Sequence, residues 1–344
     1  MAPRRQRQIA KSITQSILNS DRKTSFLDRL RAYFHIYTLR YTCVSESTFQ
    51  SLRATWHVDE ESYRQSFQGP NALSTIGDMG YSGSTFFATR NGAWLVKSIP
   101  RRFESSFFRD ELLQPYVEYV ADNPETVLIR IVEFLQGSQI SIGLVLGLVP
   151  AHQIVMENLR REENERTPAE GEKWESWDLK PMSYFYPERD VAGGALSSKA
   201  TKSKLADEFN DKLILSRDQA EHFKGQLEKD TALLAKHNAV DYSLFLVRMP
   251  ASMAPSQGTT ETWRNGVHTA DGKYVYRAAI LDFFWAKHTI HAKAMTGLIK
   301  SYNIVDARGP MSVTTEAPEY RERFLKMCRD FIEVSNGGGS FPSE

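Results

Sequence analysis

Apolar positions along the chain recur at two spacings, one typical of helices and the other typical of strands. Between residues 101 and 120 the apolar side chains lie close to helical spacing, and this pattern stops just before Pro124. Because proline disfavours a helical conformation in the residue that precedes it, we predict a helix that ends there. The apolar positions of this helix are Phe103, Phe107, Phe108, Leu112 and Tyr116.

A second helix is predicted to begin after Ser216. Ser216 and Gln219 have the spacing of a capping box, in which the serine side chain accepts a hydrogen bond from the first helical turn. Phe223, Leu227 and Leu234 then form one apolar face. Residues 240–249 and 274–285 are rich in strand-forming residues. Short strands in the first half of the chain, with helices and paired strands in the second, indicate an α+β protein with two lobes.

Length and composition limit the class of protein. The chain has 344 residues, of which 41% are hydrophobic, so it can bury one large core or two linked cores. Its formal net charge of +1 argues against a strongly basic nucleic-acid binder, so we expect no nucleic-acid partner. The two cysteines, Cys43 and Cys328, lie far apart without metal-ligand spacing. This usage favours a reducing, cytoplasmic setting.

Two stretches bear on contact with a membrane. The longest apolar run, Ile140 to Ala151, contains two glycines and is too short to span a bilayer, so we predict buried strand and turn there and no transmembrane segment. The first residues of the chain include Arg4, Arg5, Arg7 and Lys11 before any acidic residue. Three interpretations of this segment remain open: a transit peptide, a basic arm that contacts phosphates or acidic lipid, and a solvated tail. The solvated tail is favoured.

Polar stretches at 160–176 and 250–272, together with a glycine-rich C-terminus, separate the patterned parts of the chain. The predicted organisation is a basic N-terminal arm and helix at 1–44, an N-lobe at 45–159, a polar inter-lobe insertion at 160–176, a C-lobe at 177–335 and a flexible tail at 336–344.

A glycine-rich loop precedes a predicted hairpin that carries one lysine. Asn91-Gly92 favours a type I′ turn between strands at 84–90 and 93–99, and a two-residue loop places Phe86 opposite Lys97. Gly80 and Gly83 lie in the loop that enters this hairpin. Backbone N–H groups beside small residues, together with a nearby ammonium group, suit the binding of nucleotide phosphates. The alternative is a lysine that protects an edge strand from aggregation.

Two aspartates follow predicted elements where a phosphoryl-transfer site needs carboxylates. Asp241 comes directly after the capped helix, and Asp282 ends an apolar strand. Such carboxylates bind metal or sit near the attacking hydroxyl, because this chemistry depends on positioning and charge neutralisation. The alternatives are a turn residue at 241 and a strand-terminating residue at 282. An ordinary protein kinase is not indicated, because H-R-D is absent and Phe284 replaces the glycine of D-F-G.

Eight short segments, in the same order, resemble those of the phosphatidylinositol phosphate kinases over roughly residues 45 to 335. The glycine loop and the lysine strand read YSGSTFF and WLVKSI, and the following segments read NPETVL and IVMENL. The second half contains WDLK, VDYSLFLV, AILDF and MSVTTEAPEYRERFLKMC.

This resemblance implies a two-lobed lipid-kinase fold distantly related to protein kinases, with an antiparallel-sheet N-lobe and a smaller mixed C-lobe. It implies a peripheral membrane enzyme that uses ATP and Mg²⁺ to phosphorylate the inositol ring of a phosphoinositide, with a homodimer as an open alternative. The implied ATP-binding residues are Lys97 with the loop residues Gly80, Ser82, Gly83 and Ser84, and the adenine hinge at Met156, Asn158 and Leu159. Lys180 would approach the transferred phosphate, Asp241 would be catalytic and Asp282 would bind the metal. Glu104 and Glu111 are both candidates for the partner of Lys97.

The resemblance also implies that the region after Asp282 contacts substrate or membrane, through Lys287, His291, Lys293 and Lys300. Phe283, Phe284 and Trp285 either insert into lipid or pack in the core, and we favour packing. Pro181 departs from the family pattern, since glycine follows the corresponding lysine there, and proline removes a backbone donor beside the phosphate. An active lipid kinase is favoured over two alternatives, a catalytically impaired scaffold and a kinase of soluble inositol phosphates.

Overall fold

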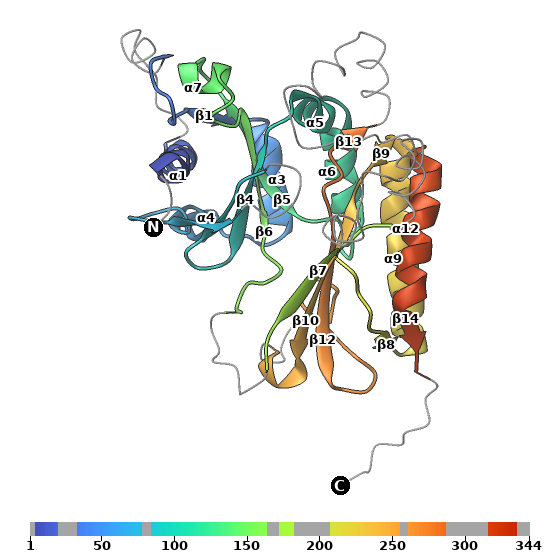
Figure 1. Ribbon diagram of the computed structural model, residues 1–344. Helices are drawn as coiled ribbons and strands as arrows, with labels where there is room; N and C mark the ends of the chain where they lie inside the picture. The colour runs from blue at the N-terminus through green and yellow to red at the C-terminus, as the bar shows by residue number, and fades with distance from the viewer. Residues whose placement is uncertain are drawn as a thin grey trace, which may run out of the picture. The chain divides into compact units, whose positions relative to one another are not determined.

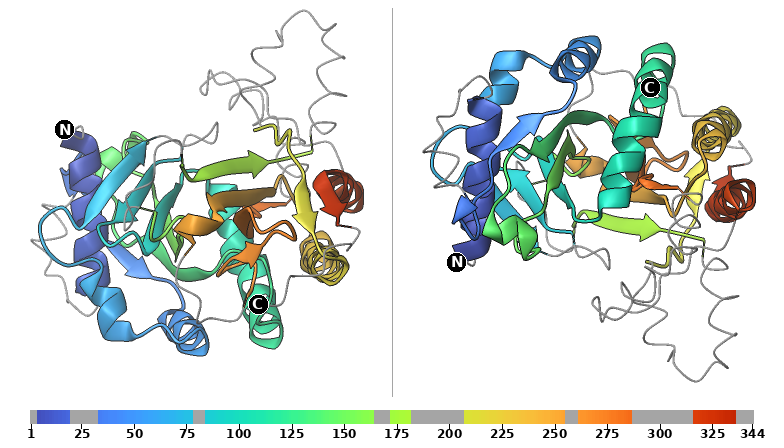
Figure 2. Two further views of the ribbon diagram at one scale, coloured as in Figure 1. Left: turned by 90° about the horizontal axis from the view of Figure 1, so that it is seen from below. Right: turned by 90° about the horizontal axis from the view of Figure 1, so that it is seen from above.

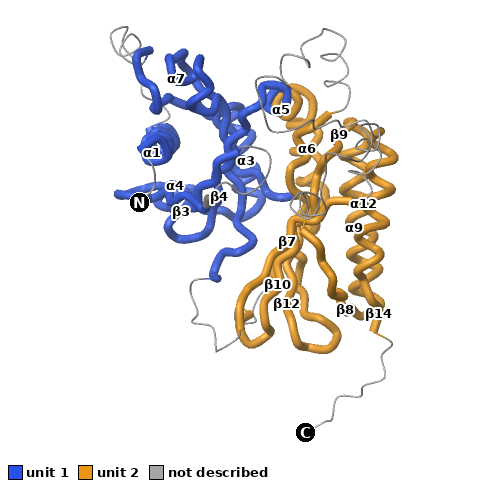
Figure 3. The backbone as a smooth tube through the Cα atoms, viewed as in Figure 1, with its two compact units in different colours: residues 1–106, 129–165 blue, residues 107–128, 166–344 orange. Residues whose placement is uncertain are grey.

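The computed structural model describes residues 4–19, 33–77, 84–163, 172–181, 207–254, 261–286 and 316–335. The chain forms two compact units, one of residues 1–106 and 129–165 and the other of residues 107–128 and 166–344 (Figure 3). Both units combine helices with antiparallel sheets, which confirms the α+β prediction (Figure 1). Among the described residues, no helix is long and apolar enough to cross a membrane.

Unit 1 is built on a six-stranded antiparallel sheet in the order β1-β5-β6-β4-β3-β2. Buried side chains from its central strands, such as Val96, Phe134 and Val155, form the core of the unit. Its strands are β1 Tyr41–Cys43, β2 Leu73–Gly77, β3 Phe86–Thr89, β4 Trp94–Ile99, β5 Ile131–Gly137 and β6 His152–Glu157. Its helices are α1 Arg4–Leu18, α3 Glu46–Thr55, α4 Glu60–Gln65, α5 Arg102–Phe107, which reaches the boundary with unit 2, and α7 Ile142–Val145.

The N-terminal basic segment is a packed helix, so the interpretation of it as a solvated tail is wrong for residues 4–18. Ile9, Ile13 and Ile17 are buried because their spacing of four places them on one face of α1. Backbone N–H groups near β1 donate to the serine hydroxyls on this face, at 2.9 Å from Tyr41 to Ser16. The four basic residues at the start of the chain hid this amphipathic pattern.

The apolar run from Ile140 to Ala151 is also not the buried strand and turn that we predicted. It contains the short helix α7, in which Ser141 caps the first turn by accepting from the Leu144 N–H at 3.2 Å. The backbone of Ile36 passes so close that a Cβ on Gly143 would lie 1.7 Å from its carbonyl oxygen. This close approach holds α7 against the segment that contains Ile36, while Val145 and the following residue, Leu146, stay exposed.

Unit 2 contains a four-stranded antiparallel sheet in the order β11-β12-β10-β7, and α9 and α12 lie side by side (Figure 1). Two small sheets pair β13 with β9 and β14 with β8. The strands are β7 Glu175–Leu179, β8 Leu213–Leu215, β9 Ala239–Val240, β10 Ser243–Pro250, β11 Val267–His268, β12 Tyr274–Leu281, β13 Trp285–Ala286 and β14 Ile332–Val334. The helices are the π-helical segment η1 Phe108–Leu112, α6 Leu113–Asp122, α9 Arg217–Lys236, the short 3-10 segment η3 Ala251–Met253 and α12 Ala317–Phe331.

The two predicted helices are confirmed in position, and one of them is irregular inside. α9 has both hydrogen bonds of the capping box between Ser216 and Gln219, and its predicted apolar face is buried. The helix predicted at 101–120 ends at Asp122, as the following proline required. It is interrupted by η1, whose wider turns cannot be read from the spacing of its apolar residues.

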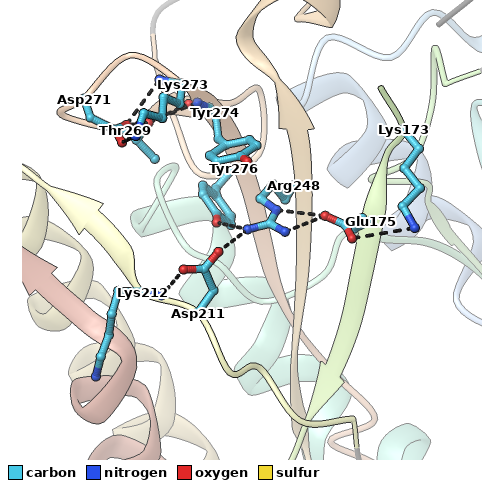
Figure 4. Close-up of polar contacts among 10 residues, drawn as sticks. All are labelled: Lys173, Glu175, Asp211, Lys212, Arg248, Thr269, Asp271, Lys273, Tyr274 and Tyr276. Atoms are coloured by element: carbon cyan, nitrogen blue, oxygen red, sulfur yellow. Dashed lines mark hydrogen bonds and ion pairs between the residues drawn. The ribbon is translucent and has the colours of Figure 1, made fainter. Parts of the chain in front are cut away.

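Arg248 on β10 links three parts of unit 2 (Figure 4). Its guanidinium group pairs with Glu175 on β7 and with Asp211 in the segment before β8. It also lies over the ring of Tyr274 on β12, 4.6 Å from the ring centroid. These contacts join β7, β10 and β12 at the end of the sheet remote from the residues described next.

Candidate active site

The hairpin that carries Lys97 has the predicted register. Phe86 on β3 lies opposite Lys97 on β4. The turn differs from the predicted type I′ form, because Gly92 has φ 71° whereas Asn91 is not in the positive-φ region. The Gly92 N–H donates to the Thr89 carbonyl at 2.9 Å, so the turn closes one residue earlier and the strands are shorter than expected.

Lys97 occupies the interior of the sheet. β4 lies between β3 and β6, so the interpretation of Lys97 as an edge-strand guard is wrong. Its side chain is 5% exposed, and its ammonium group lies 5.3 Å from the centroid of the Phe86 ring. Ser84, the one residue of the predicted phosphate loop within the described part of the chain, is buried nearby at the start of this hairpin. Gly80, Ser82 and Gly83 lie outside the described residues.

The predicted adenine hinge covers the end of β6 and the residues that follow it, and it is hydrogen-bonded to the same hairpin. Met156 pairs with Leu95 on β4, and both Met156 and Leu159 are buried. The Asn158 side-chain amide donates to the Gly92 carbonyl at 2.7 Å, while its backbone N–H donates to the Ala93 carbonyl. The sequence identified Asn158 as a hinge residue, and the geometry adds that its side chain fixes the hairpin turn.

The candidates for the partner of Lys97 lie in different units. Glu104 accepts a hydrogen bond from Arg101 at 2.9 Å and is buried in unit 1. Glu111 is an exposed residue of η1 in unit 2. The partner of Lys97 therefore stays a prediction with two alternatives.

Three other predicted site residues meet at one end of the sheet in unit 2. In the antiparallel ladders, Leu244 pairs with Leu179 and Ser243 pairs with Leu281. Lys180 directly follows β7, Asp241 lies just before β10 and Asp282 directly follows β12. Strand pairing thus brings together residues that are as many as 102 positions apart in the sequence.

Lys180 and Asp241 form the central contact of this group. The Lys180 Nζ donates to the Asp241 backbone carbonyl at 2.7 Å and to its carboxylate at 2.9 Å, and each side chain is 15% exposed. Burial acts to lower the pKa of Lys180, but the carboxylates of Asp241, Asp178 and Asp282, together with the hydrogen bond that Lys180 donates to Asp241, raise it by more. The net pKa lies above the ordinary value, so Lys180 keeps its charge at neutral pH.

Both candidate aspartates adopt an unusual backbone conformation. Asp241 and Asp282 each have φ 63°, in the left-handed region. Aspartate and asparagine enter this region more readily than other non-glycine residues, and such positions cluster at functional sites. Val240 and Trp285 pair beside the two aspartates, so the small β9-β13 ladder holds both turns in place. Both residues lie in turns between strands, so the alternatives of a turn residue at 241 and a strand-terminating residue at 282 stay open.

Sequence reasoning missed Asp178 as a member of this group. Asp178 lies two residues before Lys180 on β7, and its carboxylate contributes to the raised pKa of Lys180. Residues two apart on a strand share a face, so this spacing was the available signal.

The aromatic residues after Asp282 pack in the core, as we favoured. Phe283, Phe284 and Trp285 are all buried. Phe284 contacts Phe108 edge-on, and Phe283 stacks on Tyr116, so the predicted helix residues and the segment after Asp282 share one cluster. Lys287, His291, Lys293 and Lys300 lie outside the described residues.

Comparison with known families shows the family to which the chain belongs. The family model for phosphatidylinositol-4-phosphate 5-kinases matches residues 67–268, which include Lys97, Lys180 and Asp241. The chain belongs to the phosphatidylinositol-4-phosphate 5-kinase family. The resemblance noted in the sequence is therefore confirmed.

Two curated relatives carry kinase names. The chain is 26% identical over 212 residues to a probable phosphatidylinositol phosphate kinase of Dictyostelium discoideum, an alignment that covers 58% of this chain and 26% of the relative. It is 29% identical over 122 residues to the phosphatidylinositol 4-phosphate 5-kinase its3 of Schizosaccharomyces pombe, which covers 34% of this chain and 16% of that protein. The chain thus spans about a quarter or less of the length of these relatives.

Membership of the kinase family raises the question of whether the group fits a divalent ion. The described residues contain no cluster of three or more His, Cys, Asp or Glu side chains with metal-binding geometry. Mg²⁺ at kinase sites is commonly held by one or two carboxylates together with substrate phosphates and water. Asp282 and Asp241, whose carboxylates face the same lysine, fit this smaller donor set.

We expect Asp241→Asn to lower the pKa of Lys180 and the stability of this kinase-family chain. Because the folded-state pKa of Lys180 is raised, its ion pair stabilises the fold fully below the unfolded-state value and is lost as pH rises through the folded-state value. At neutral pH the variant should lose about 1–2 kcal/mol of unfolding free energy. Urea denaturation across alkaline pH measures this difference, which should shrink as Lys180 deprotonates. A difference independent of pH would contradict the assignment.

Proposed function

We propose that this chain transfers the γ-phosphate of ATP to an inositol-ring hydroxyl of a phosphoinositide at a membrane surface. The observation that supports the proposal most strongly is the meeting of Lys180, Asp241 and Asp282 at one end of the β7-β10-β12 sheet in a member of this family. Phosphoryl transfer depends mainly on positioned charges, and this group supplies one lysine and several carboxylates on a rigid sheet end.

The roles of these residues follow from their charges and contacts. Asp241 is proposed to orient the attacking hydroxyl and accept its proton, since its carboxylate lies 2.9 Å from the Lys180 ammonium group at the end of the sheet. Lys180 is proposed to neutralise the transferred phosphoryl group while remaining bound to the Asp241 backbone. Asp282 is proposed to hold Mg²⁺, which when bound offsets negative charge on the ATP phosphates.

ATP binding is proposed to use residues of unit 1. Lys97 would contact the nucleotide phosphates with the loop residues Gly80, Ser82, Gly83 and Ser84, and Met156, Asn158 and Leu159 would border adenine. The position of Lys97 on β4, opposite Phe86 in the hairpin that follows this loop in the sequence, supports the role, because an ammonium group near such a loop can neutralise phosphate charge. Lys287, His291, Lys293 and Lys300 are proposed to contact substrate or membrane, which makes the chain a peripheral membrane protein.

A second candidate function is a phosphoinositide-binding scaffold that has lost efficient catalysis. Pro181 favours this candidate, because a buried proline directly follows Lys180 and removes a backbone N–H beside the proposed phosphate. The scaffold predicts that Lys97→Met leaves lipid binding intact and that the wild-type chain consumes no ATP.

The test supplies γ-labelled ATP and magnesium with either monophosphorylated phosphoinositides in vesicles or the corresponding soluble inositol phosphates. The kinase proposal predicts labelled lipid, loss of labelling when a chelator removes the metal, and recovery when Mg²⁺ is restored. Labelled soluble inositol phosphate with unlabelled lipid would instead assign a soluble substrate. Vesicle binding without any labelling would support the scaffold.

A further inference from the structure

The largest group of exposed apolar side chains in the described part of unit 1 lies around α7. Ile140, Val145 and Leu146 are 67%, 70% and 64% exposed, and Phe34 in the neighbouring segment is 64% exposed. The Gly143 N–H donates to the His35 carbonyl at 3.2 Å, so the two segments lie against each other. We call Tyr33, Phe34, Ile36, Ile140, Val145 and Leu146 the α7 patch; its other two members, Tyr33 and Ile36, are 44% and 47% exposed. Exposed aliphatic and aromatic groups gathered in this way mark interaction surfaces.

The basic helix α1 lies near α7 (Figures 1 and 2). The Arg5 guanidinium donates to the Leu148 carbonyl at 2.8 Å, which links α1 to the segment directly after α7. Arg4, Arg7 and Lys11 are exposed on the same helix. An apolar surface therefore adjoins a row of cations within one unit.

The charge around this surface is one-sided. Residues 4–19, 33–44 and 134–156, which form α1 and the segments around the α7 patch, contain five arginine and lysine residues and no aspartate or glutamate. The whole chain, by contrast, carries 43 basic and 42 acidic residues. A partner with an anionic face and an apolar interior fits this combination, and an anionic bilayer has both.

We propose that the α7 patch and α1 form a membrane-docking surface, in which Val145 and Leu146 enter the interface while α1 contacts anionic headgroups. The inference rests on the proposed lipid substrate, because an enzyme that acts on a bilayer lipid must bind the membrane surface that contains this lipid. It differs from the contacts proposed for Lys287 to Lys300, because it lies in unit 1 and combines apolar insertion with charge. This surface requires neither ATP nor phosphoinositide.

The experiment measures sedimentation with vesicles of phosphatidylcholine, with and without phosphatidylserine, in the absence of phosphoinositide and ATP. Val145→Ser with Leu146→Ser should weaken binding to phosphatidylserine vesicles at least about tenfold, because two apolar side chains no longer enter the interface. Arg4→Gln, Arg7→Gln and Lys11→Gln together should weaken it at low salt by roughly tenfold or more, with little difference at high salt. The triple variant keeps Arg5, which bonds to Leu148.

Ile76→Ser is the matched control, because Ile76 is also exposed in unit 1 but lies on β2, outside the α7 patch. Its binding should equal that of the wild type, and thermal unfolding should be unchanged in all of these surface variants. The proposal would be overturned if the wild type bound equally to vesicles with and without phosphatidylserine, or if all variants bound as tightly as the wild type. The proposal would also fail if light scattering showed that the Val145 and Leu146 substitutions turn a dimer into a monomer while the affinity for vesicles stays constant. The α7 patch would then bind a second copy of the chain.

Phosphorylation of a water-soluble, short-chain phosphoinositide separates this proposal from the proposed function. The Val145 and Leu146 substitutions should leave that activity unchanged. Activity on the soluble substrate without vesicle binding would reject the docking surface alone. Phosphatidylserine-dependent binding without activity would reject the kinase and support the docking surface.

Discussion

Asp282→Asn is expected to lower lipid phosphorylation by at least about 10²–10³-fold while the fold stays intact. The substitution removes the negative charge proposed to hold Mg²⁺ and keeps the size of the side chain. Asparagine also tolerates the left-handed backbone at this position, where φ is 63°. The loss should therefore appear in kcat, because the interaction matters most when the phosphoryl group is transferred.

The control for this substitution is Asp122→Asn, at an exposed position at the end of α6 in the same unit. Its turnover should match that of the wild type. Thermal unfolding of both variants shows whether they remain folded. An Asp282→Asn variant that is folded and turns over at more than about a tenth of the wild-type rate would remove Asp282 from the proposed chemistry.

Asp230→Ala is expected to cost about 3–5 kcal/mol of unfolding free energy, the largest stability effect we predict. Asp230 is fully buried on α9 and accepts hydrogen bonds from Tyr119, Thr126, Gln226 and the Val127 N–H, at 2.6–2.8 Å. Burial raises the pKa of its carboxyl, although these hydrogen bonds oppose the rise. Alanine would leave four donors without this acceptor in the interior of unit 2.

The hydrogen bonds of Asp230 are connected through Val127 to β12, the strand that ends just before Asp282 of the candidate site. The Val127 carbonyl accepts from the Ile280 N–H at 2.6 Å, and Ile280 lies two residues before Asp282 on β12. Urea denaturation measures the predicted loss, with Glu221→Ala on the exposed face of the same helix expected to change stability by no more than about 0.5 kcal/mol. An Asp230→Ala variant within about 1 kcal/mol of the wild type would show that this hydrogen-bond cluster contributes little.

Local chemistry made part of the fold predictable from the sequence. The capping box at Ser216, the end of the helix before Pro124 and the register of Phe86 with Lys97 all depend on residues close together in the chain. The exposed α7 segment was not predictable in this way, because its position depends on the approach of Ile36 from a distant segment. An apolar run in the sequence does not by itself show which of its side chains are buried in the folded protein.

The candidate site was predictable as a set of residues and not as a geometry. Lys180, Asp241 and Asp282 were recognised from motifs, but their meeting depends on strand pairs such as Leu179 with Leu244. The left-handed conformations of both aspartates, beside the β9-β13 ladder, could not be read from these motifs either, whereas Asp178 was available from its spacing of two from Lys180. A single sequence carries the residue types, whereas the distances are set by ladders between strands far apart in the chain.

Joint action of Lys180 and Asp282 in one phosphotransfer site can be measured with a double-mutant cycle on lipid phosphorylation. Rates are measured with magnesium, ATP and phosphoinositide vesicles for the wild type, Lys180→Met, Asp282→Asn and the double variant. We predict that each single variant is severely impaired and that the double variant is little worse than either, because residues that act as a unit are not additive. Near-wild-type rates in the folded single variants, or losses that simply multiply in the double variant, would show that Lys180 and Asp282 do not act as a unit.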